Sequence, residues 1–171
     1  KNKWPKDSLC IVNLRDDTLV KVSGLKKYAL SKEGNTLCYL TNSTVKAKGW
    51  RPFSKTKPSR KVNMLHVYTA YPNIFLALEG VTDFRLSDDG NRLAILKELT
   101  IDKEKTYSIS VYDLRSKNPV REFDQAEKFK LSRWSTSADK FAFYQRQDTS
   151  LENYELYIYD FKTNKSSIIG A

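Results

Sequence analysis

Short apolar strands separated by polar turns recur along the chain. Residues 28–40 (YALSKEGNTLCYL) and 84–96 (FRLSDDGNRLAIL) are identical at six of 13 positions, and residues 132–144 (SRWSTSADKFAFY) are a weaker third copy without gaps. Each copy has an apolar strand, a four-residue polar turn and a second apolar strand, a pattern typical of a β-hairpin. Glycine holds one fixed place in the first two turns, as expected where the backbone needs a positive φ.

A second element, in which one face is apolar with period two, recurs four times, at residues 8–14, 64–70, 108–114 and 155–161. Alternation with period two is typical of a β-strand. One face of each strand carries an aliphatic pair: Leu9/Ile11, Leu65/Val67, Ile109/Val111 and Leu156/Ile158. Each strand ends at a short polar side chain suited to a turn, namely Asn13, Thr69, Asp113 or Asp160, and a further strand follows.

The two elements repeat with the same spacing. Ser31 and Ser87 are 56 residues apart, Ser87 and Ser135 are 48 apart, and the alternating strands repeat after 56, 44 and 47 residues. Four antiparallel strands in a period of about 50 residues are typical of the blade of a β-propeller. We therefore predict an all-β fold, a β-propeller segment of about three and a half four-stranded antiparallel blades.

The predicted organisation is a single partial propeller over residues 1–171, with a half-blade at 8–23 and full blades at 25–79, 81–122 and 128–169. The first full blade is longer because residues 41–61 enter between its second and third strands. This stretch contains seven cations and no acid, and its two prolines, Pro52 and Pro58, interrupt regular structure. We predict a long, exposed basic loop there.

The charge of the chain is unevenly distributed. The net charge is +10; residues 1–61 hold 15 basic and 4 acidic side chains, whereas the remainder is nearly balanced. In such a stretch, cationic side chains can bind phosphates and the aromatic rings between them can stack on bases. The candidate partner-binding residues are Lys46, Lys48, Trp50, Arg51, Phe53, Lys55, Lys57, Arg60 and Lys61. The composition favours a solvated insertion first, an acidic or membrane-surface partner second and nucleic acid last.

The sequence predicts no catalytic, cofactor or metal site. His66 is the only histidine, and it occupies the repeat position filled by Cys10, Ser110 and Tyr157 in the sister strands, so we interpret it as a strand residue. One histidine and two cysteines are a poor set of metal ligands. No G-x-S-x-G nucleophile motif is present in the sequence.

The remaining cysteine and carboxylate patterns also favour structural roles. Cys10 and Cys38 fall at packing positions of adjacent blades with no evident proximity, so a disulfide between them is not favoured. Asp88 and Asp89 are replaced by Lys32 and Glu33 in the first copy, which favours turn chemistry over acid/base catalysis.

No apolar run is long enough to predict a membrane span. The chain opens with KNKW and not with methionine and an apolar signal core, so we expect a trimmed product or an excised fragment. An arc of three and a half blades is expected to expose strand edges and apolar faces. The rest of a parent chain, or a second copy that completes a ring, would cover them; partial disorder with aggregation is the remaining alternative.

The repeat residues carry a resemblance to a known family. Residues 86–94 (LSDDGNRLA), followed by Val111-Tyr-Asp-Leu114, resemble the repeat of TolB-like propellers and of the N-terminal propeller of prolyl oligopeptidase family serine peptidases. Residues 4–14 (WPKDSLCIVNL) and 22–31 (VSGLKKYALS) more narrowly resemble long secreted peptidases of that family from Bacteroidetes-type bacteria. The resemblance implies a periplasmic or secreted, non-catalytic part, because the family's catalytic triad lies in a C-terminal α/β-hydrolase domain that this chain lacks. Propellers of that family have seven or eight blades, so three and a half blades are a departure from the family's pattern and leave open whether this chain closes a ring or is an arc of one.

Two functional hypotheses follow. The first is a non-catalytic propeller segment of a prolyl oligopeptidase-like peptidase, which gates the access of peptide substrates to a hydrolase domain absent from this chain. The second is a stand-alone propeller that binds a protein or polyanionic partner through its basic insertion, with steep salt dependence as its signature. The absence of a nucleophile motif supports the first hypothesis, and the basic stretch supports the second.

Overall fold

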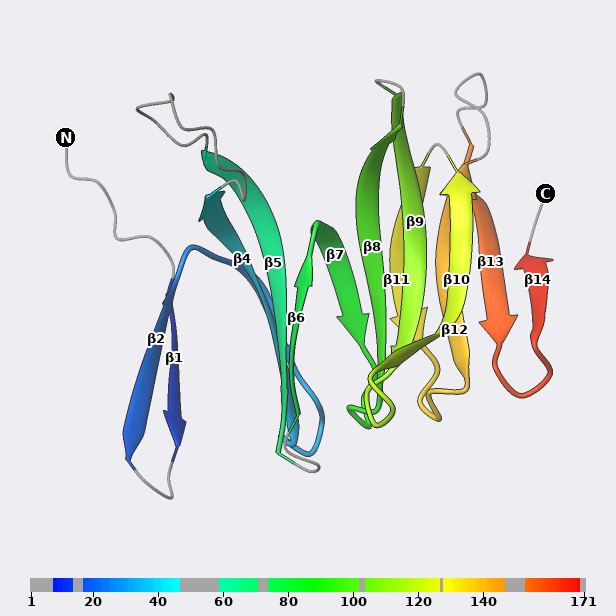
Figure 1. Ribbon diagram of the computed structural model, residues 1–171. Coiled ribbons are helices and arrows are strands. Elements are labelled where there is room, and N and C mark those ends of the chain that lie inside the picture. The colour runs from blue at the N-terminus through cyan, green and yellow to red at the C-terminus, as the bar shows by residue number, and fades with distance from the viewer. Residues whose placement is uncertain are drawn as a thin grey trace.

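The computed structural model describes residues 8–13, 17–46, 59–70, 74–101, 104–126, 128–146 and 153–169. In these residues the chain forms strands and turns, and its sheets stand side by side in chain order (Figure 1). No helix long and apolar enough to cross a membrane occurs in this described part of the chain.

Four antiparallel sheets follow the order of the chain. The half-blade contains β1 (Ser8–Asn13) and β2 (Thr18–Ser23). The first full blade contains β3 (Leu25–Leu30), β4 (Thr36–Lys46), β5 (Ser59–Thr69) and β6 (Ile74–Glu79). The second contains β7 (Val81–Leu86), β8 (Arg92–Ile101), β9 (Glu104–Asp113) and β10 (Asn118–Ala126). The third contains β11 (Lys128–Trp134), β12 (Lys140–Arg146), β13 (Glu155–Asp160) and β14 (Lys165–Ile169), so the predicted fold class is confirmed.

The first two strands of each full blade are joined by the repeated polar turn. Gly34 and Gly90 both have φ of 72° at the same place in this turn, which is the left-handed conformation that favours glycine. Ala138 takes the equivalent place in the third copy with φ of 55°. The sequence pattern therefore specifies a turn that is kept even where the glycine is lost.

The structure differs from the predicted boundaries in two places. β4 and β5 pair without interruption from Thr36 and Thr69 to Lys46 and Ser59, so residues 41–46 and 59–61 form strands instead of a loop. Extended backbone is favoured there by Thr41, Thr44 and Val45, because branched side chains suit strands. β10 likewise continues to Ala126, beyond the predicted end of its blade at residue 122.

Two apolar clusters hold the full blades together. Cys38, Leu65 and Val67 of the first blade pack against Phe84 and Ile95 of the second. The next interface joins aliphatic residues of the second blade to aromatic residues of the third, chiefly Ile109, Val111, Phe141 and Phe143. Neither cluster includes a residue from the described part of the half-blade. The core of this protein therefore lies between successive sheets.

Candidate functional site

The structure places three of the predicted partner-binding residues at one end of the β4–β5 ladder. Lys46 ends β4 opposite Ser59, while Arg60 and Lys61 of β5 lie opposite Val45 and Thr44. The other six residues, Lys48, Trp50, Arg51, Phe53, Lys55 and Lys57, lie outside the described residues. The backbone therefore brings Lys46, Arg60 and Lys61 together, and the binding role stays a prediction.

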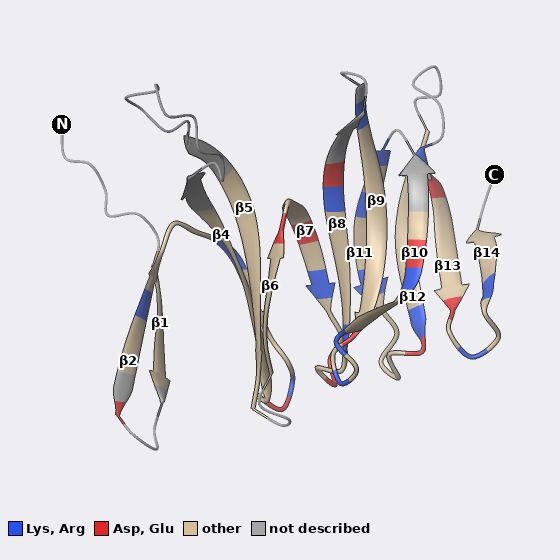
Figure 2. Cartoon of the chain, in the orientation of Figure 1, with Lys and Arg blue, Asp and Glu red and all other residues tan. Residues whose placement is uncertain are grey.

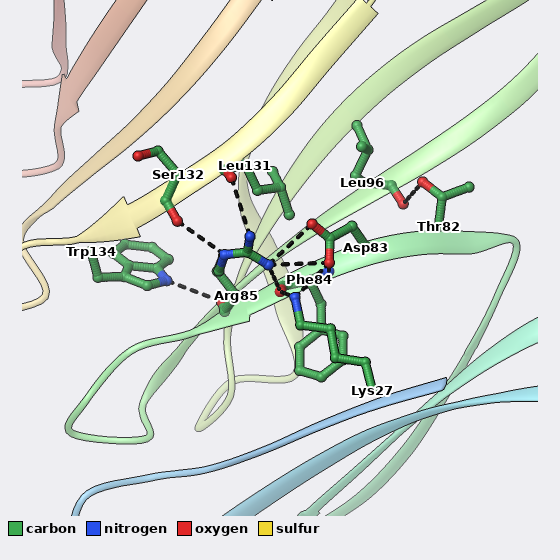
Figure 3. A network of polar contacts seen from close by, with 9 residues as sticks. All are labelled: Lys27, Thr82, Asp83, Phe84, Arg85, Leu96, Leu131, Ser132 and Trp134. Carbon is green, nitrogen blue, oxygen red and sulfur yellow. Dashed lines mark hydrogen bonds and ion pairs between the residues drawn. The ribbon is translucent and has the colours of Figure 1, made fainter. Parts of the chain in front are cut away.

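A polar network that the sequence reasoning missed joins the first strands of the full blades (Figure 3). The ammonium group of Lys27 on β3 lies 2.5 Å from Asp83 Oδ1 on β7 and donates a 2.7 Å hydrogen bond to the carbonyl of Phe84. Arg85 Nη1 donates to Asp83 Oδ2 at 3.0 Å. Asp83 therefore connects two cations from adjacent blades.

The network continues from the second blade to the third. Arg85 Nε donates to the carbonyl of Ser132 on β11 at 3.0 Å, and the indole nitrogen of Trp134 donates back to the carbonyl of Arg85 at 3.0 Å. These contacts satisfy backbone carbonyls of first strands, which have a partner strand on one side only. The charged side chains of Lys27, Asp83 and Arg85 are about one-third exposed, so solvent screens their attraction.

A shallow groove of about 530 Å³ lies beside this network, between the second and third blades. Its lining combines guanidinium groups, a carboxylate, hydroxyls and an indole: Arg85, Leu86, Asp88, Ser132, Arg133, Trp134 and Thr136. Arg133 occupies the repeat position of Arg85 but its side chain is exposed. The mixed polar and aromatic lining suits a polar, extended ligand such as a peptide backbone.

Charged residues also gather at the turns along the lower edge of the second and third full blades (Figure 2). Asp89 accepts hydrogen bonds from Ser87 Oγ at 2.6 Å and from the backbone of Asn91 at 3.1 Å. Partial burial raises the pKa of Asp89, but these hydrogen bonds and nearby Arg92 outweigh burial, so its pKa lies below the ordinary value. This carboxylate therefore has the turn role that the repeat comparison predicts.

The equivalent turn of the third blade is organised around Asp139. Lys162 Nζ lies 2.7 Å from its carboxylate, and the hydroxyl of Ser135 donates to it at 2.8 Å. Lys162, Ser137 and Ser135 hold the pKa of Asp139 well below its ordinary value. The site keeps a charged carboxylate and offers no proton for general acid catalysis near neutral pH.

His66 lies in β5, as predicted, and stacks on Tyr39 with ring centroids 4.8 Å apart. Its Nδ1 atom is buried without a hydrogen-bond partner, and burial lowers the pKa of the ring. Cys10 and Cys38 are free, and burial raises the pKa of the Cys38 thiol to about 12. Within the described ranges, no three His, Cys, Asp or Glu residues are grouped so that they could hold a metal ion.

One signal in the sequence could have identified the network. Alignment of the repeats places Lys27 and Asp83 at the same position of successive first strands. Opposite charges at equivalent positions of neighbouring blades predict an ion pair if the first strands lie side by side. The contacts of Arg85 and Trp134 with backbone carbonyls carry no comparable signal, because a carbonyl acceptor is present at every residue.

No protein-family model and no curated protein matches this chain. Solved structures do share its fold. The β-propeller domain of the Trilobed protease from Pyrococcus furiosus matches with a TM-score of 0.60 and 16% identity over 85% of this chain. Acylaminoacyl peptidase from Pyrococcus horikoshii matches with a TM-score of 0.61 and 11% identity over 96% of this chain. TolB from Acinetobacter baumannii matches with a TM-score of 0.54 and 13% identity, also over 96%.

These similarities show that the chain has the fold of a partial β-propeller like those of peptidases and of TolB. The chain spans 42% of the Trilobed protease propeller, 28% of the acylaminoacyl peptidase and 37% of TolB. The predicted resemblance is therefore confirmed at the level of the fold.

Proposed function

We propose that this chain is a non-catalytic propeller segment of a prolyl oligopeptidase-like serine peptidase. The observation that carries this proposal is the stack of four-stranded blades, which is similar over 85% of the chain to the propeller domain of one protease and over 96% to an acylaminoacyl peptidase. The repeat motif of residues 86–94 supports the same family. A periplasmic or secreted location is part of this proposal and rests on the resemblance.

The proposed role of the segment is to select the peptides that reach a hydrolase domain. Apolar side chains fill the two interfaces between the three full blades, so a folded protein would not pass between these sheets. A short extended peptide offers backbone carbonyls that can accept hydrogen bonds from the exposed guanidinium of Arg133, and apolar side chains that can pack on the ring of Trp134. Selection would therefore depend on the size and flexibility of the peptide.

Assays of the purified chain with chromogenic prolyl and alanyl peptides test the non-catalytic part of this proposal. We expect no turnover above the buffer rate, and a serine-directed phosphonate should not label the chain. Turnover that the phosphonate abolishes would show a nucleophile in this chain and would overturn the proposal.

A peptide titration followed by tryptophan fluorescence tests the groove. We expect weak, saturable binding of a short prolyl peptide with a Kd of about 1 mM, because the groove is shallow and open. Arg133→Gln should weaken this binding, whereas Arg115→Gln, an exposed change outside the groove, should leave it unchanged. Equal peptide affinities of the parent chain, Arg133→Gln and Arg115→Gln would show that the peptide does not bind in the groove.

The basic stretch supports a second candidate function, a propeller that binds a polyanionic or protein partner. Seven cations occur in residues 41–61 without an acid, and three of these residues lie at the end of one ladder. We expect the chain to bind immobilised heparin and to elute later than a variant in which Lys46, Lys48, Arg51, Lys55 and Lys57 are changed to Ser.

A second variant of equal net charge provides the control for this heparin experiment. It changes five exposed lysines outside the stretch to Ser: Lys21, Lys32, Lys117, Lys128 and Lys165. If the stretch is the contact surface, this control should elute at higher salt than the first variant. Co-elution of the two variants would show a response to net charge alone and would contradict the second function.

A further inference from the structure

The turns of adjacent full blades are in direct contact at the first of the two blade junctions. The backbone amide of Lys32 in the first full blade donates to the carbonyl of Asp88 in the second at 2.9 Å. The hydroxyl of Thr36 also donates to the carbonyl of Gly90 at 3.0 Å. A Cβ atom at Gly90 would lie 2.8 Å from Thr36 Oγ1, so no space remains between the β3–β4 and β7–β8 turns at this point.

The junction between the second and third full blades is not closed in this way. In the aligned repeats Arg92 takes the place of Thr36, and Ala138 takes the place of Gly90. Among the described residues, no backbone hydrogen bond joins the β7–β8 turn to the β11–β12 turn. A cavity of about 190 Å³ lies there, and both Arg92 and Ala138 line it.

Charged side chains of both signs line this cavity. They are Arg92 of β8, Arg115 of the β9–β10 turn, Asp89 of the β7–β8 turn and Asp113 of β9. These turns lie along the lower edge of the blades, where Figure 2 shows both cationic and acidic segments. The formal charges of the four side chains cancel at neutral pH. The cavity shares no lining residue with the groove at Arg133 and Trp134, so it is a second, separate candidate site.

Arg92 has hydrogen-bonding capacity that the described residues do not use. Its Nη1 atom is buried and has no hydrogen-bond partner among them. Its guanidinium lies over the ring of Phe161, with 4.5 Å between Cζ and the ring centroid. This stacking uses the face of the guanidinium and leaves its N–H donors unspent. A buried donor without an acceptor is costly, and an acceptor in the cavity would remove that cost.

Asp113 has unused capacity of the opposite kind. Its Oδ1 atom accepts hydrogen bonds from the backbone amides of Arg115 at 2.8 Å and Ser116 at 3.3 Å. Both hydrogen bonds that the turn donates to this side chain therefore end on Oδ1. The Oδ2 atom of Asp113 is left as an acceptor for a donor in the cavity.

We infer that this cavity binds a small amino-acid zwitterion. The carboxylate of the ligand accepts hydrogen bonds from the guanidinium of Arg92, and its ammonium group donates to Oδ2 of Asp113. A lining whose charges cancel suits a ligand whose charges cancel, because each ion of the ligand meets one of opposite sign. A simple anion would satisfy Arg92 but would also lie near two carboxylates, and a simple cation would lie near two guanidinium groups.

A titration of the full chain with L-alanine, followed by the NMR shifts of backbone amides, tests this site. We expect saturable shifts at Arg92 and Ser116 with a Kd of about 1 mM, because a ligand of this size makes few contacts. Propionate lacks the ammonium group of alanine, and ethylamine lacks its carboxylate. At matched ionic strength each should bind at least about tenfold more weakly than L-alanine.

Arg92→Thr removes the guanidinium and introduces the residue that the first full blade has at this position. The variant should fold, because Thr36 already occupies the equivalent junction and bonds to the turn of the next blade. A urea midpoint close to that of the parent chain checks the fold. We expect the saturable shifts with L-alanine to be lost in this variant.

Asp113→Asn tests the ammonium contact separately. The asparagine keeps an oxygen for the two backbone amides of the turn and replaces only the free oxygen with an amide group. We expect L-alanine to bind about tenfold more weakly, whereas propionate should bind no more weakly than to the parent chain, because a nearby negative charge has been removed.

Asp160→Asn is the matched control for this substitution. Asp160 accepts hydrogen bonds from the backbone amides of Lys162 at 2.8 Å and Thr163 at 3.2 Å in the equivalent turn of the third full blade. It does not line the cavity. The control should therefore leave the affinities for L-alanine and propionate unchanged.

The contrary outcomes of these titrations are distinct from one another. Equal affinities of the parent chain for L-alanine and propionate would show an anion site that does not recognise the ammonium group. Shifts that do not saturate up to about 100 mM L-alanine would show that there is no site. Equal weakening by Asp113→Asn and Asp160→Asn would assign the effect to net charge. Each result overturns the inference and leaves the proposed peptidase role untouched, because that role does not depend on this cavity.

Discussion

Tyr28 and Phe84 occupy the same place in successive repeats, yet Tyr28 is 60% exposed and Phe84 is fully buried. Both side chains are aromatic, both lie on a first strand, and both precede the same leucine-serine pair. The difference arises because another full blade packs against Phe84 and none packs against Tyr28. Burial in this protein is therefore a property of the neighbouring sheet, whereas the apolar pattern indicates only where burial is possible.

Substitution of these two aromatic residues should have very different effects on stability. Phe84→Ala removes a fully buried ring from the interface between the first and second full blades, and should lower the free energy of unfolding by about 3–5 kcal/mol. Tyr28→Ala, at the same repeat position, should change it by less than about 0.5 kcal/mol. Urea denaturation of both variants measures the difference; similar losses would show that a sheet covers Tyr28 in solution.

The turns allow a second comparison at smaller scale. A Cβ atom at Gly90 would lie 2.8 Å from side-chain atoms of Ser31, Asn35 and Thr36 in the adjacent blade, whereas a Cβ at Gly34 would meet nothing within 4 Å. Both glycines have φ of 72°, so Gly34→Ala should cost about 1 kcal/mol from backbone strain alone.

Gly90→Ala should cost about 1–3 kcal/mol more than Gly34→Ala, because the added methyl group separates the turns of two blades. Thermal unfolding of the two variants measures the contrast. Equal losses of stability in the two variants would indicate that the turns of the two blades move apart around the added methyl group without lowering the free energy of unfolding.

The ion pairs at the first strands should have a more modest effect. Asp83→Asn leaves Lys27 and Arg85 without their shared carboxylate and should destabilise the protein by about 1 kcal/mol, since these side chains are partly exposed. Glu98→Gln disrupts a pair with the more exposed Lys105 and serves as the comparison.

The effect of Asp83→Asn should shrink in high salt, because added ions screen partly exposed charges. Denaturation midpoints at low and high ionic strength give this measurement. A loss that is independent of salt would assign the role of Asp83 to hydrogen bonding, including its 2.9 Å bond from the amide of Phe84.

Asp139 should make a small contribution to the pH dependence of stability in acid. Lys162, Ser137 and Ser135 lower the pKa of Asp139 from its ordinary value of 3.8, so the folded state binds a proton less readily than the unfolded state. The stability from Asp139 is therefore present above pH 3.8 and is lost as the pH falls toward the folded-state pKa.

Asp139→Asn should flatten the acid side of the stability profile, and Thr136→Ser, an exposed change without a titratable group in the same turn, should not. Urea midpoints measured from neutral pH to below pH 3.8 compare the two variants with the parent chain. An unchanged acid slope in Asp139→Asn would show that Lys162 and the serines do not favour the charged carboxylate.

The basic stretch and the first strands show how far sequence reasoning extends to the candidate sites. The cations of residues 41–61 are visible from composition alone, but the extension of β4 to Lys46 and of β5 back to Ser59 is not. The prolines at 52 and 58, which lie outside the described residues, predict a loop, but the branched residues Thr44 and Val45 continue the ladder as far as Lys46. The groove at Arg133 and Trp134 was not predicted, since it forms only where two blades meet.

Local sequence patterns were enough to predict most strands, their order and the repeated turns between them, because alternation and turn chemistry act over a few neighbouring residues. Examples of features predicted in this way are the positive φ at Gly34 and Gly90 and the position of His66 in a strand. The burial of particular apolar faces, and the way Lys27, Asp83 and Arg85 connect the blades (Figure 3), depend on how the sheets pack together. Those contacts join residues about 50 positions apart, and their partners depend on how whole sheets pack.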